Sequence, residues 1–294
     1  MSEHTTAERR AVCVAGLGDI GAGLTHVLAA AGHEVIALVE DDAAVRAGVE
    51  RIGASLDRAV GRDEPAPTDR DRVMGRIQVT TRVDDLRDVD LVLEALETDL
   101  DATVERLVAI LGRTRNGCAV ATTSSILSVT ELAAALPDPT RVAGFHVFAP
   151  VPDVDAIEVV AALQTSEELL EGLETLVAGL PDKVAVRVDD RPGFLLDALV
   201  RPYLNDVISE FADGLATAED LDVALRLGLG YRSGPLERLD RVGLDEHLRT
   251  TEALHRATGD SRYAPPPLLR AMVAAGHLGE KTGRGFHLHE NKEH

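Results

Sequence analysis

The sequence predicts an α/β domain with a mainly parallel sheet over residues 10–189, followed by an all-α domain over residues 190–294. Three observations support this prediction. Short apolar runs alternate with helix-like segments through the first two thirds of the chain, which is typical of parallel α/β folds. A glycine-rich turn joins the first run to the first helix, and beyond residue 190 apolar residues recur every three or four positions. Residues 1–9 lack an apolar core, so we expect a loose tail and not a signal peptide.

The first elements predict a dinucleotide site. The apolar run Ala11–Ala15 reads as a buried strand, and it leads into the G-x-G-x-x-G segment Gly16–Gly21. The helix-like Ala22–Ala31 follows, and then a second strand, Glu34–Val39, ends at Glu40. A strand, this glycine pattern, a helix and an acid about 20 residues further on are the signature of a Rossmann-type dinucleotide-binding domain. The alternative is a glycine turn that serves only packing.

Each residue of this turn has an expected role. Glycines let the backbone approach a pyrophosphate closely, and the free N–H groups of a helix N-terminus bind its oxygens. Glu40 should accept hydrogen bonds from an adenosine ribose. Asp19 is unexpected, because it places an acid close to the phosphates. The cofactor-binding candidates of this region are Gly16, Gly18, Asp19, Ile20, Gly21 and Glu40.

The rest of the first domain continues the alternation of strands and helices. We expect a polar helix to about Gly61, a loop over Arg62–Pro67, strands at Arg76–Thr80, Leu91–Ala95 and Gly117–Thr122, and helices at Leu100–Leu111, Ser128–Leu136 and Ser166–Leu180. The strand Lys183–Val188 closes the domain, and Asp189-Asp-Arg-Pro-Gly marks its boundary. Helices at 217–227, 243–258 and 267–275 are expected beyond it.

His146 and Glu158 form a candidate acid–base pair. The segments Arg141–Phe148 and Ala156–Val160 are rich in strand-forming residues, and Pro150 and Pro152 interrupt the chain between them. Two strands joined in this way could bring Glu158 against the His146 imidazole. A carboxylate on one ring nitrogen fixes the tautomer and leaves the other nitrogen free to move a proton. The competing interpretation is a histidine that merely packs in an apolar strand.

Composition excludes several function classes. The 294 residues are 45% hydrophobic, and no apolar run approaches the roughly 18 residues that span a membrane. A net charge of −20 argues against nucleic acid and anionic membranes as partners. Cys13 and Cys118 lie in expected strands, so they read as core residues in a reducing, cytoplasmic compartment. The histidines show no spacing that indicates a metal site.

These segments together resemble the 3-hydroxyacyl-CoA dehydrogenase family from about Arg10 to about His289. The matching segments are Gly16–Gly21 with Glu40, Leu93-Glu-Ala-Leu, Thr123-Ser-Ser, Gly144–Pro152 with Glu158, Asp190-Arg-Pro-Gly-Phe, Arg201-Pro-Tyr-Leu-Asn, Gly230-Tyr-Arg-Ser-Gly-Pro, Asp240-Arg-Val-Gly-Leu-Asp and Gly279-Glu-Lys-Thr-Gly-Arg-Gly-Phe. The resemblance implies a Rossmann-type domain that binds NAD and a helical domain that forms a homodimer. It also implies oxidation of a 3-hydroxyacyl thioester, as in fatty acid metabolism.

The resemblance assigns further roles. His146 would take the hydroxyl proton while hydride leaves for the nicotinamide, Glu158 would orient His146, and Ser124 would bond the substrate oxygen. Ser124 could instead cap the helix around Val129. Glu94, Ala95 and Glu97 would lie on the cofactor side. An arginine-bearing segment would help hold the CoA phosphates, unless it is an ordinary solvated helix face: Arg46, Arg51, Arg58, Arg62, Arg70, Arg72 and Arg76.

Four positions depart from the family. The family usually has Asn at the positions of Ala149 and Asp197, and Glu and Lys at those of Thr98 and Thr103. Asp197 falls where the family has a catalytic hydrogen-bond donor, so it would have to be protonated or to serve a different substrate, or else pair with Arg201. Two alternatives therefore stay open: a specialised hydroxyacyl group on an acyl carrier protein, and an inactive relative that binds NAD or serves a structural role.

Overall fold

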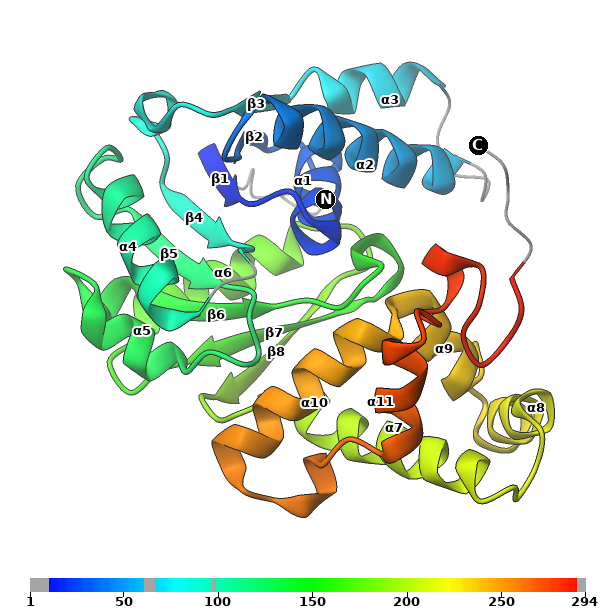
Figure 1. Cartoon of the computed structure of the whole chain (residues 1–294). Coiled ribbons are helices and arrows are strands. Elements are labelled where there is room, and N and C mark those ends of the chain that lie inside the picture. Colours follow the sequence, from blue (N-terminus) through cyan, green and yellow to red (C-terminus); the bar gives the residue numbers. More distant parts are fainter. Residues whose placement is uncertain (1–10, 61–66, 97–98, 290–294) are drawn as a thin grey trace, which may run out of the picture. The chain divides into compact units, whose positions relative to one another are not determined.

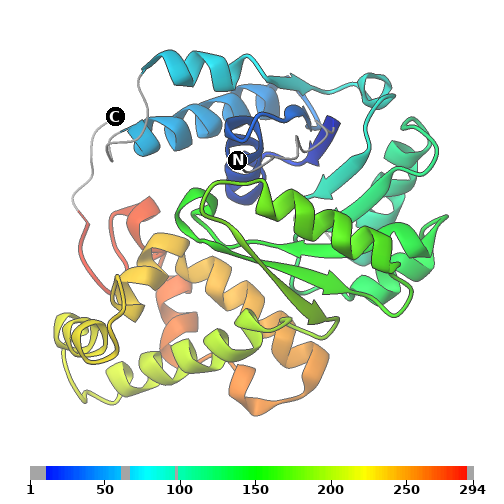
Figure 2. The same cartoon turned by 180° about the vertical axis from the view of Figure 1, so that it is seen from behind.

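The computed structural model describes residues 11–60, 67–96 and 99–289 (Figures 1 and 2). They fall into two compact units, one ending at Phe194 and the other beginning at Leu195. The N-terminal unit contains the sheet, and the C-terminal unit is built from helices. No helix among these residues combines the length and apolar character needed to cross a membrane.

An eight-stranded sheet forms the N-terminal unit, in the order β3-β2-β1-β4-β5-β6-β7-β8. Its strands are β1 (Ala11–Ala15), β2 (Glu34–Leu38), β3 (Ile77–Thr80), β4 (Leu91–Glu94), β5 (Ala119–Thr122), β6 (Val142–His146), β7 (Ala156–Ala161) and β8 (Val184–Asp189). Strands β1 to β6 run parallel to one another, β7 runs antiparallel to β6, and β8 is parallel to β7. The 3-2-1-4-5-6 order is that of a Rossmann-type domain, so this part of the fold prediction is confirmed.

Helices cover both faces of this sheet (Figures 1 and 2). One face packs against α1 (Asp19–Ala30), α2 (Asp42–Val60), α3 (Pro67–Met74) and α6 (Glu167–Ala178). The other packs against α4 (Leu100–Leu111) and α5 (Val129–Ala135). Neighbouring strand residues divide between the two cores: Val12 and Val14 belong to the first and Cys13 and Ala15 to the second. This follows from the two-residue repeat of a strand, and it explains why the strands read as continuous apolar runs.

Two helices of the N-terminal unit differ from the sequence prediction. Helix α1 begins at Asp19, within the glycine motif, and not at Ala22. This helix start requires a glycine at position 21, because a Cβ there would collide with the carbonyl oxygen of Gly16. Helix α3 was not predicted, because a loop was expected through Pro67. Proline suits the first turn of a helix, where its missing N–H has no intrahelical partner in any case.

The C-terminal unit consists of α7 (Leu196–Ala212), α8 (Ala218–Leu229), α9 (Pro235–Val242), α10 (Leu244–Thr258) and α11 (Pro267–Ala274). They share one apolar core that includes Ile208, Leu236, Leu244 and Leu269. Helix α9 was not predicted from the sequence. Its N-terminus is capped by Asp222 of α8, which accepts hydrogen bonds from the amides of Leu236 and Glu237 at 2.8 and 2.9 Å. Pro235 at the first position of α9 and Glu237 at the third are local start signals that the sequence prediction did not use, whereas the cap from Asp222 depends on tertiary packing.

Candidate active site

His146 and Glu158 face each other at the end of the sheet. They are directly paired in the antiparallel register of β6 and β7, as the sequence predicts for two strands joined across this turn. His146 Nδ1 lies 2.6 Å from Glu158 Oε2, and the residues are 5% and 0% exposed. A carboxylate accepts, so Nδ1 carries the shared proton, and Nε2 is the ring nitrogen on the side away from Glu158.

Two phenylalanine rings hold the imidazole in place. Phe148 lies edge-on to His146 with ring centroids 4.4 Å apart, and Phe194 does so at 5.4 Å. Phe194 is 1% exposed and has a φ of 48°, which is costly for a bulky residue. Its position follows from Gly193, whose amide donates to the carbonyl oxygen of Ser125 at 3.0 Å. The Asp-Arg-Pro-Gly-Phe segment therefore ends by packing an aromatic ring on the histidine.

A buried lysine fixes the connection between β6 and β7. Lys183 Nζ donates to the carbonyl oxygens of Val151, Pro152 and Val154 at 2.9–3.0 Å. Val151 in turn packs on α1 so closely that a Cβ at Gly23 would come within 2.7 Å of its own Cβ. The sequence did not reveal this role, because Lys183 is about 30 residues from the loop that it holds. The loop that separates His146 from Glu158 is thus tied to both β8 and α1.

Ser124 follows β5 at the same edge of the sheet. Thr122 of β5 pairs with Gly144 of β6, so Ser124 and His146 each lie two residues beyond this pair. The Ser124 amide donates to Thr122 Oγ1 at 3.1 Å. Helix α5 is capped by Ser128, whose hydroxyl accepts from the Glu131 amide. The alternative of Ser124 as the helix cap is therefore wrong.

The glycine turn is built for close approach. Gly16 has a φ of 99°, and a Cβ there would lie 2.5 Å from the carbonyl oxygen of Ala95, so a side chain at this position would clash. Helix α1 has Gly18 as its N-cap and no side-chain cap, whereas serines cap α5 and α6. The first-turn amides of α1 are thus left to an anionic ligand, with α1 beginning beside the carboxyl end of β1. This geometry fits a dinucleotide pyrophosphate.

Charged residues around this turn are paired within the protein. The Asp19 side chain is 86% exposed, and its carboxylate lies 3.8 Å from Arg51 Nε. The unexpected acid therefore points toward solvent. Glu40 follows β2, and its carboxylate lies 2.8 Å from an Arg106 nitrogen. Arg106 was not among the predicted site residues. Glu97 lies outside the described residues.

Glu94 is turned away from solvent. It is 0% exposed, and its carboxyl accepts from the Thr122 hydroxyl and from the Leu96 amide, each at 2.5 Å. Burial raises the pKa of Glu94 above its ordinary value, although these two hydrogen bonds act against the shift. The side chain therefore ties β4 to β5, and the neighbouring Ala95 carries the close backbone contact to Gly16.

Asp197 lies in the first turn of α7 and is paired with Arg201. Its Oδ1 accepts from Arg201 Nε at 2.8 Å, and the two side chains are 3% and 12% exposed. Arg201 also contacts His247 Nδ1 at 3.1 Å, and His247 Nε2 lies 3.1 Å from the Asn205 amide oxygen. Burial lowers the pKa of His247 to about 3, with Arg201 acting in the same direction. A guanidinium partner favours the ionised aspartate, so the pairing with Arg201 that we considered is the arrangement found.

Several residues of the arginine-bearing segment contact groups of the protein itself. Arg51 donates to the Leu17 carbonyl, Arg70 pairs with Asp57 at 3.0 Å, and Arg76 donates to the Ala29 carbonyl. Arg62 lies outside the described residues. These contacts favour the interpretation of the segment as a helix face that braces its own domain.

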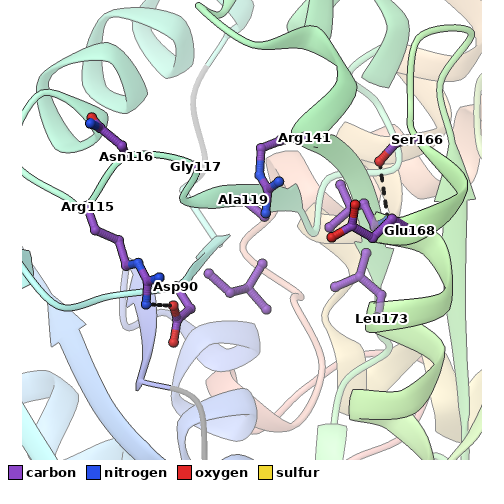
Figure 3. A pocket seen from close by; sticks show the side chains of 12 residues that line it. Asp90, Arg115, Asn116, Gly117, Ala119, Arg141, Ser166, Glu168 and Leu173 are labelled. Carbon is purple, nitrogen blue, oxygen red and sulfur yellow. Dashed lines mark hydrogen bonds and ion pairs between the residues drawn. The ribbon is translucent and has the colours of Figure 1, made fainter.

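A hollow of about 660 Å³ opens at the opposite edge of the sheet (Figure 3). It lies at the start of β4 and β5 and contains Arg141 together with Asp90 and Arg115, which form an ion pair at 2.5 Å. None of the predicted site residues lines it. The cysteines also stand apart from the site: Cys13 and Cys118 are free and buried, and burial raises their pKa values to about 12 and about 11.

Comparisons with known proteins agree with this geometry. The family description "3-hydroxyacyl-CoA dehydrogenase, NAD binding domain" matches residues 11–191, and the C-terminal domain of the same family matches residues 193–289. A 3-hydroxybutyryl-CoA dehydrogenase of Mycobacterium tuberculosis is 39% identical over 278 residues, which cover 94% of this chain and 97% of the relative. A probable 3-hydroxybutyryl-CoA dehydrogenase of Bacillus subtilis is 35% identical, covering 97% of this chain and 99% of the relative.

Solved structures show the same likeness. The crystal structure of M. tuberculosis FadB2 matches with a TM-score of 0.90 at 37% identity, covering 96% of this chain and 99% of that one. That of (S)-3-hydroxybutyryl-CoA dehydrogenase PaaH1 from Ralstonia eutropha matches with a TM-score of 0.85 at 34% identity, covering 97% of this chain and 100% of that one. With both of its domains matched, this chain belongs to the 3-hydroxyacyl-CoA dehydrogenase family of NAD-dependent oxidoreductases.

Proposed function

We propose that this protein interconverts a 3-hydroxyacyl-CoA thioester and its 3-oxoacyl form, with His146 and Glu158 as the acid–base pair. The observation that carries the proposal is the 2.6 Å contact between His146 Nδ1 and Glu158 Oε2, both of them buried. A short acyl chain such as 3-hydroxybutyryl is the first substrate to test, because the relatives above are named for it.

In the oxidative direction His146 Nε2 takes the proton of the C3 hydroxyl as hydride leaves C3. NAD, held by the glycine turn and Glu40, would supply the acceptor for that hydride. The C3–H and O–H bonds break and a carbonyl forms, so one hydride and one proton leave the substrate. Glu158 bonds the opposite ring nitrogen and stabilises the imidazolium that results. In the reductive direction the same imidazolium returns the proton to the carbonyl oxygen.

The remaining site residues have supporting roles in this proposal. Ser124 donates a hydrogen bond to the substrate oxygen that His146 serves. The first-turn amides of α1 at Asp19, Ile20 and Gly21 bind the pyrophosphate, and Gly16 and Gly18 keep the turn open. Glu40 bonds the adenosine ribose, and Ala95 borders the cofactor through its backbone. Asp197, held by Arg201, accepts a hydrogen bond from the substrate, at the position where the family usually has an asparagine that donates one.

The enzyme assay is the reduction of acetoacetyl-CoA, followed by loss of NADH absorbance. Turnover with saturable kinetics is expected, and a change in NADH fluorescence should report that the cofactor binds. A thioester on an acyl carrier protein, tested in the same assay, addresses the alternative substrate. NADH binding without turnover on either carrier would instead indicate an inactive relative.

We also propose that the protein acts as a homodimer. Apolar side chains of the C-terminal unit remain exposed on α7 and α8, among them Leu199, Val223, Leu227 and Leu229 at 39–73% exposure. Val223 and Leu227 are one helical turn apart, so they lie on one face of α8. Exposed apolar residues grouped in this way are typical of an interface between subunits.

A further inference from the structure

We infer that Arg106 is a specificity-determining residue, which works with Glu40 to read the 2′ position of the adenosine ribose. This inference rests on the proposed function, because it takes NAD as the cofactor. The basis is the contact between an Arg106 nitrogen and Glu40 Oε1 at 2.8 Å. An acid after the second strand of a Rossmann-type domain is the group that bonds a ribose hydroxyl. A guanidinium on that acid is therefore within reach of whatever the ribose carries.

The fold brings these two residues together from different elements. Glu40 follows β2, and Arg106 lies in the second turn of α4; Figure 1 labels both elements. Leu107, the next residue of α4, is fully buried in the same apolar cluster as Leu38 at the end of β2. Packing of α4 against the sheet thus fixes the position of Arg106 relative to the end of β2 and to Glu40. The two side chains are 35% and 67% exposed, so both are accessible to a ligand.

Glu40 and Arg106 act oppositely on a phosphate at the 2′ position. Glu40 repels it, while Arg106 attracts it and can donate a forked pair of hydrogen bonds to it. A free 2′-hydroxyl carries no charge, so it accepts from the guanidinium or donates to the carboxylate at little electrostatic cost. Glu40 therefore sets the preference for NADH, and Arg106 limits how strong that preference is. Asp41 and Asp42 add negative charge next to Glu40, which leaves the wild-type balance in favour of NADH.

The test measures dissociation constants of NADH and NADPH by fluorescence, independently of turnover. In the wild type NADH should bind more tightly. Arg106→Leu should weaken NADPH binding about tenfold, equivalent to about 1.4 kcal/mol, and change NADH binding less than threefold. Glu40→Gln should do the opposite and shift the preference to NADPH, because it leaves the guanidinium without its counter-charge. The double variant should have a ratio of the two dissociation constants that lies between those of the single variants.

Arg113→Leu is the matched control. Arg113 lies just beyond α4 and pairs with Asp84 at 3.5 Å, so this change removes the same charge away from Glu40. It should leave the ratio of the two dissociation constants within twofold of wild type, and Arg106→Lys, which keeps the charge, should stay closer to wild type than Arg106→Leu.

Two results would contradict the inference. One is an Arg106→Leu protein whose ratio of dissociation constants matches wild type, and the other is a Glu40→Gln protein that still prefers NADH. Failure of the wild type to bind NADH at all is a different result, which would refute the proposed function itself.

Discussion

Replacing Glu158 with Gln tests how much of the catalysis depends on the buried carboxylate. Glu158 is 0% exposed and its partner His146 only 5%, so water cannot replace the lost charge. A hydrogen bond to a charged group contributes about 1.5–3 kcal/mol, of which the neutral amide recovers only part. Each 1.36 kcal/mol of barrier is a tenfold change in rate. We therefore expect kcat for acetoacetyl-CoA reduction to fall by roughly 10- to 100-fold.

The assay compares kcat and the NADH dissociation constant in wild type, Glu158→Gln and Glu174→Gln. Glu174 pairs with the exposed Arg187 at 2.7 Å, so its variant removes the same charge at the surface of the same unit. The NADH dissociation constants of all three proteins should agree within about threefold, because His146 and Glu158 lie on β6 and β7 and not at the glycine turn. If Glu158→Gln keeps kcat within threefold of wild type while remaining folded, the carboxylate does not serve the proton transfer.

Three further outcomes are expected. Asp197→Asn should destabilise the C-terminal unit by on the order of 3 kcal/mol, since it breaks a buried ion pair with Arg201; it should not raise activity at neutral pH, and an unchanged melting temperature would contradict this. Burial lowers the pKa of His26 to about 4, helped by Arg58 and Lys183. In the unfolded chain His26 takes up a proton below its ordinary pKa of about 6.5, whereas in the folded protein it stays neutral down to about pH 4. The contribution of His26 to the free energy of unfolding is therefore fully present above pH 6.5, and about 3 kcal/mol of it is lost as the pH falls to 4. In urea unfolding of His26→Gln, the free energy of unfolding should fall less between pH 6.5 and pH 4 than in wild type. An equal fall in the two proteins would contradict this role of His26. Leu227→Asp should convert a dimer to monomers in light scattering, and a monomeric wild type at micromolar concentration would refute the dimer.

Contacts that follow from local patterns could be predicted from the sequence. His146 and Glu158 are separated by a short proline-rich connection between two strand-like segments, so antiparallel pairing brings them together. The glycine turn is equally local, because strand, turn and helix are continuous in the chain. The parallel direction of β1 to β6 likewise follows from the alternation of strands and helices.

Contacts set by tertiary packing could not be predicted. Arg106 reaches Glu40 across 66 positions of sequence, because α4 packs beside the end of β2. Lys183 reads as an ordinary start of a strand, yet its ammonium group binds three carbonyl oxygens of a distant loop. Glu94 shows a third limit: the sequence places it at a strand end, but only the structure shows that its carboxyl points into the sheet toward Thr122.

The most direct test of the account is the turnover of His146→Gln with acetoacetyl-CoA and NADH. Glutamine cannot accept and return a proton as imidazole does, so kcat should fall by roughly 100-fold or more. NADH binding should change little, because the glycine turn and Glu40 are untouched. A variant that folds, binds NADH and keeps near-native kcat would contradict the central claim, since His146 would then be a packing residue of β6.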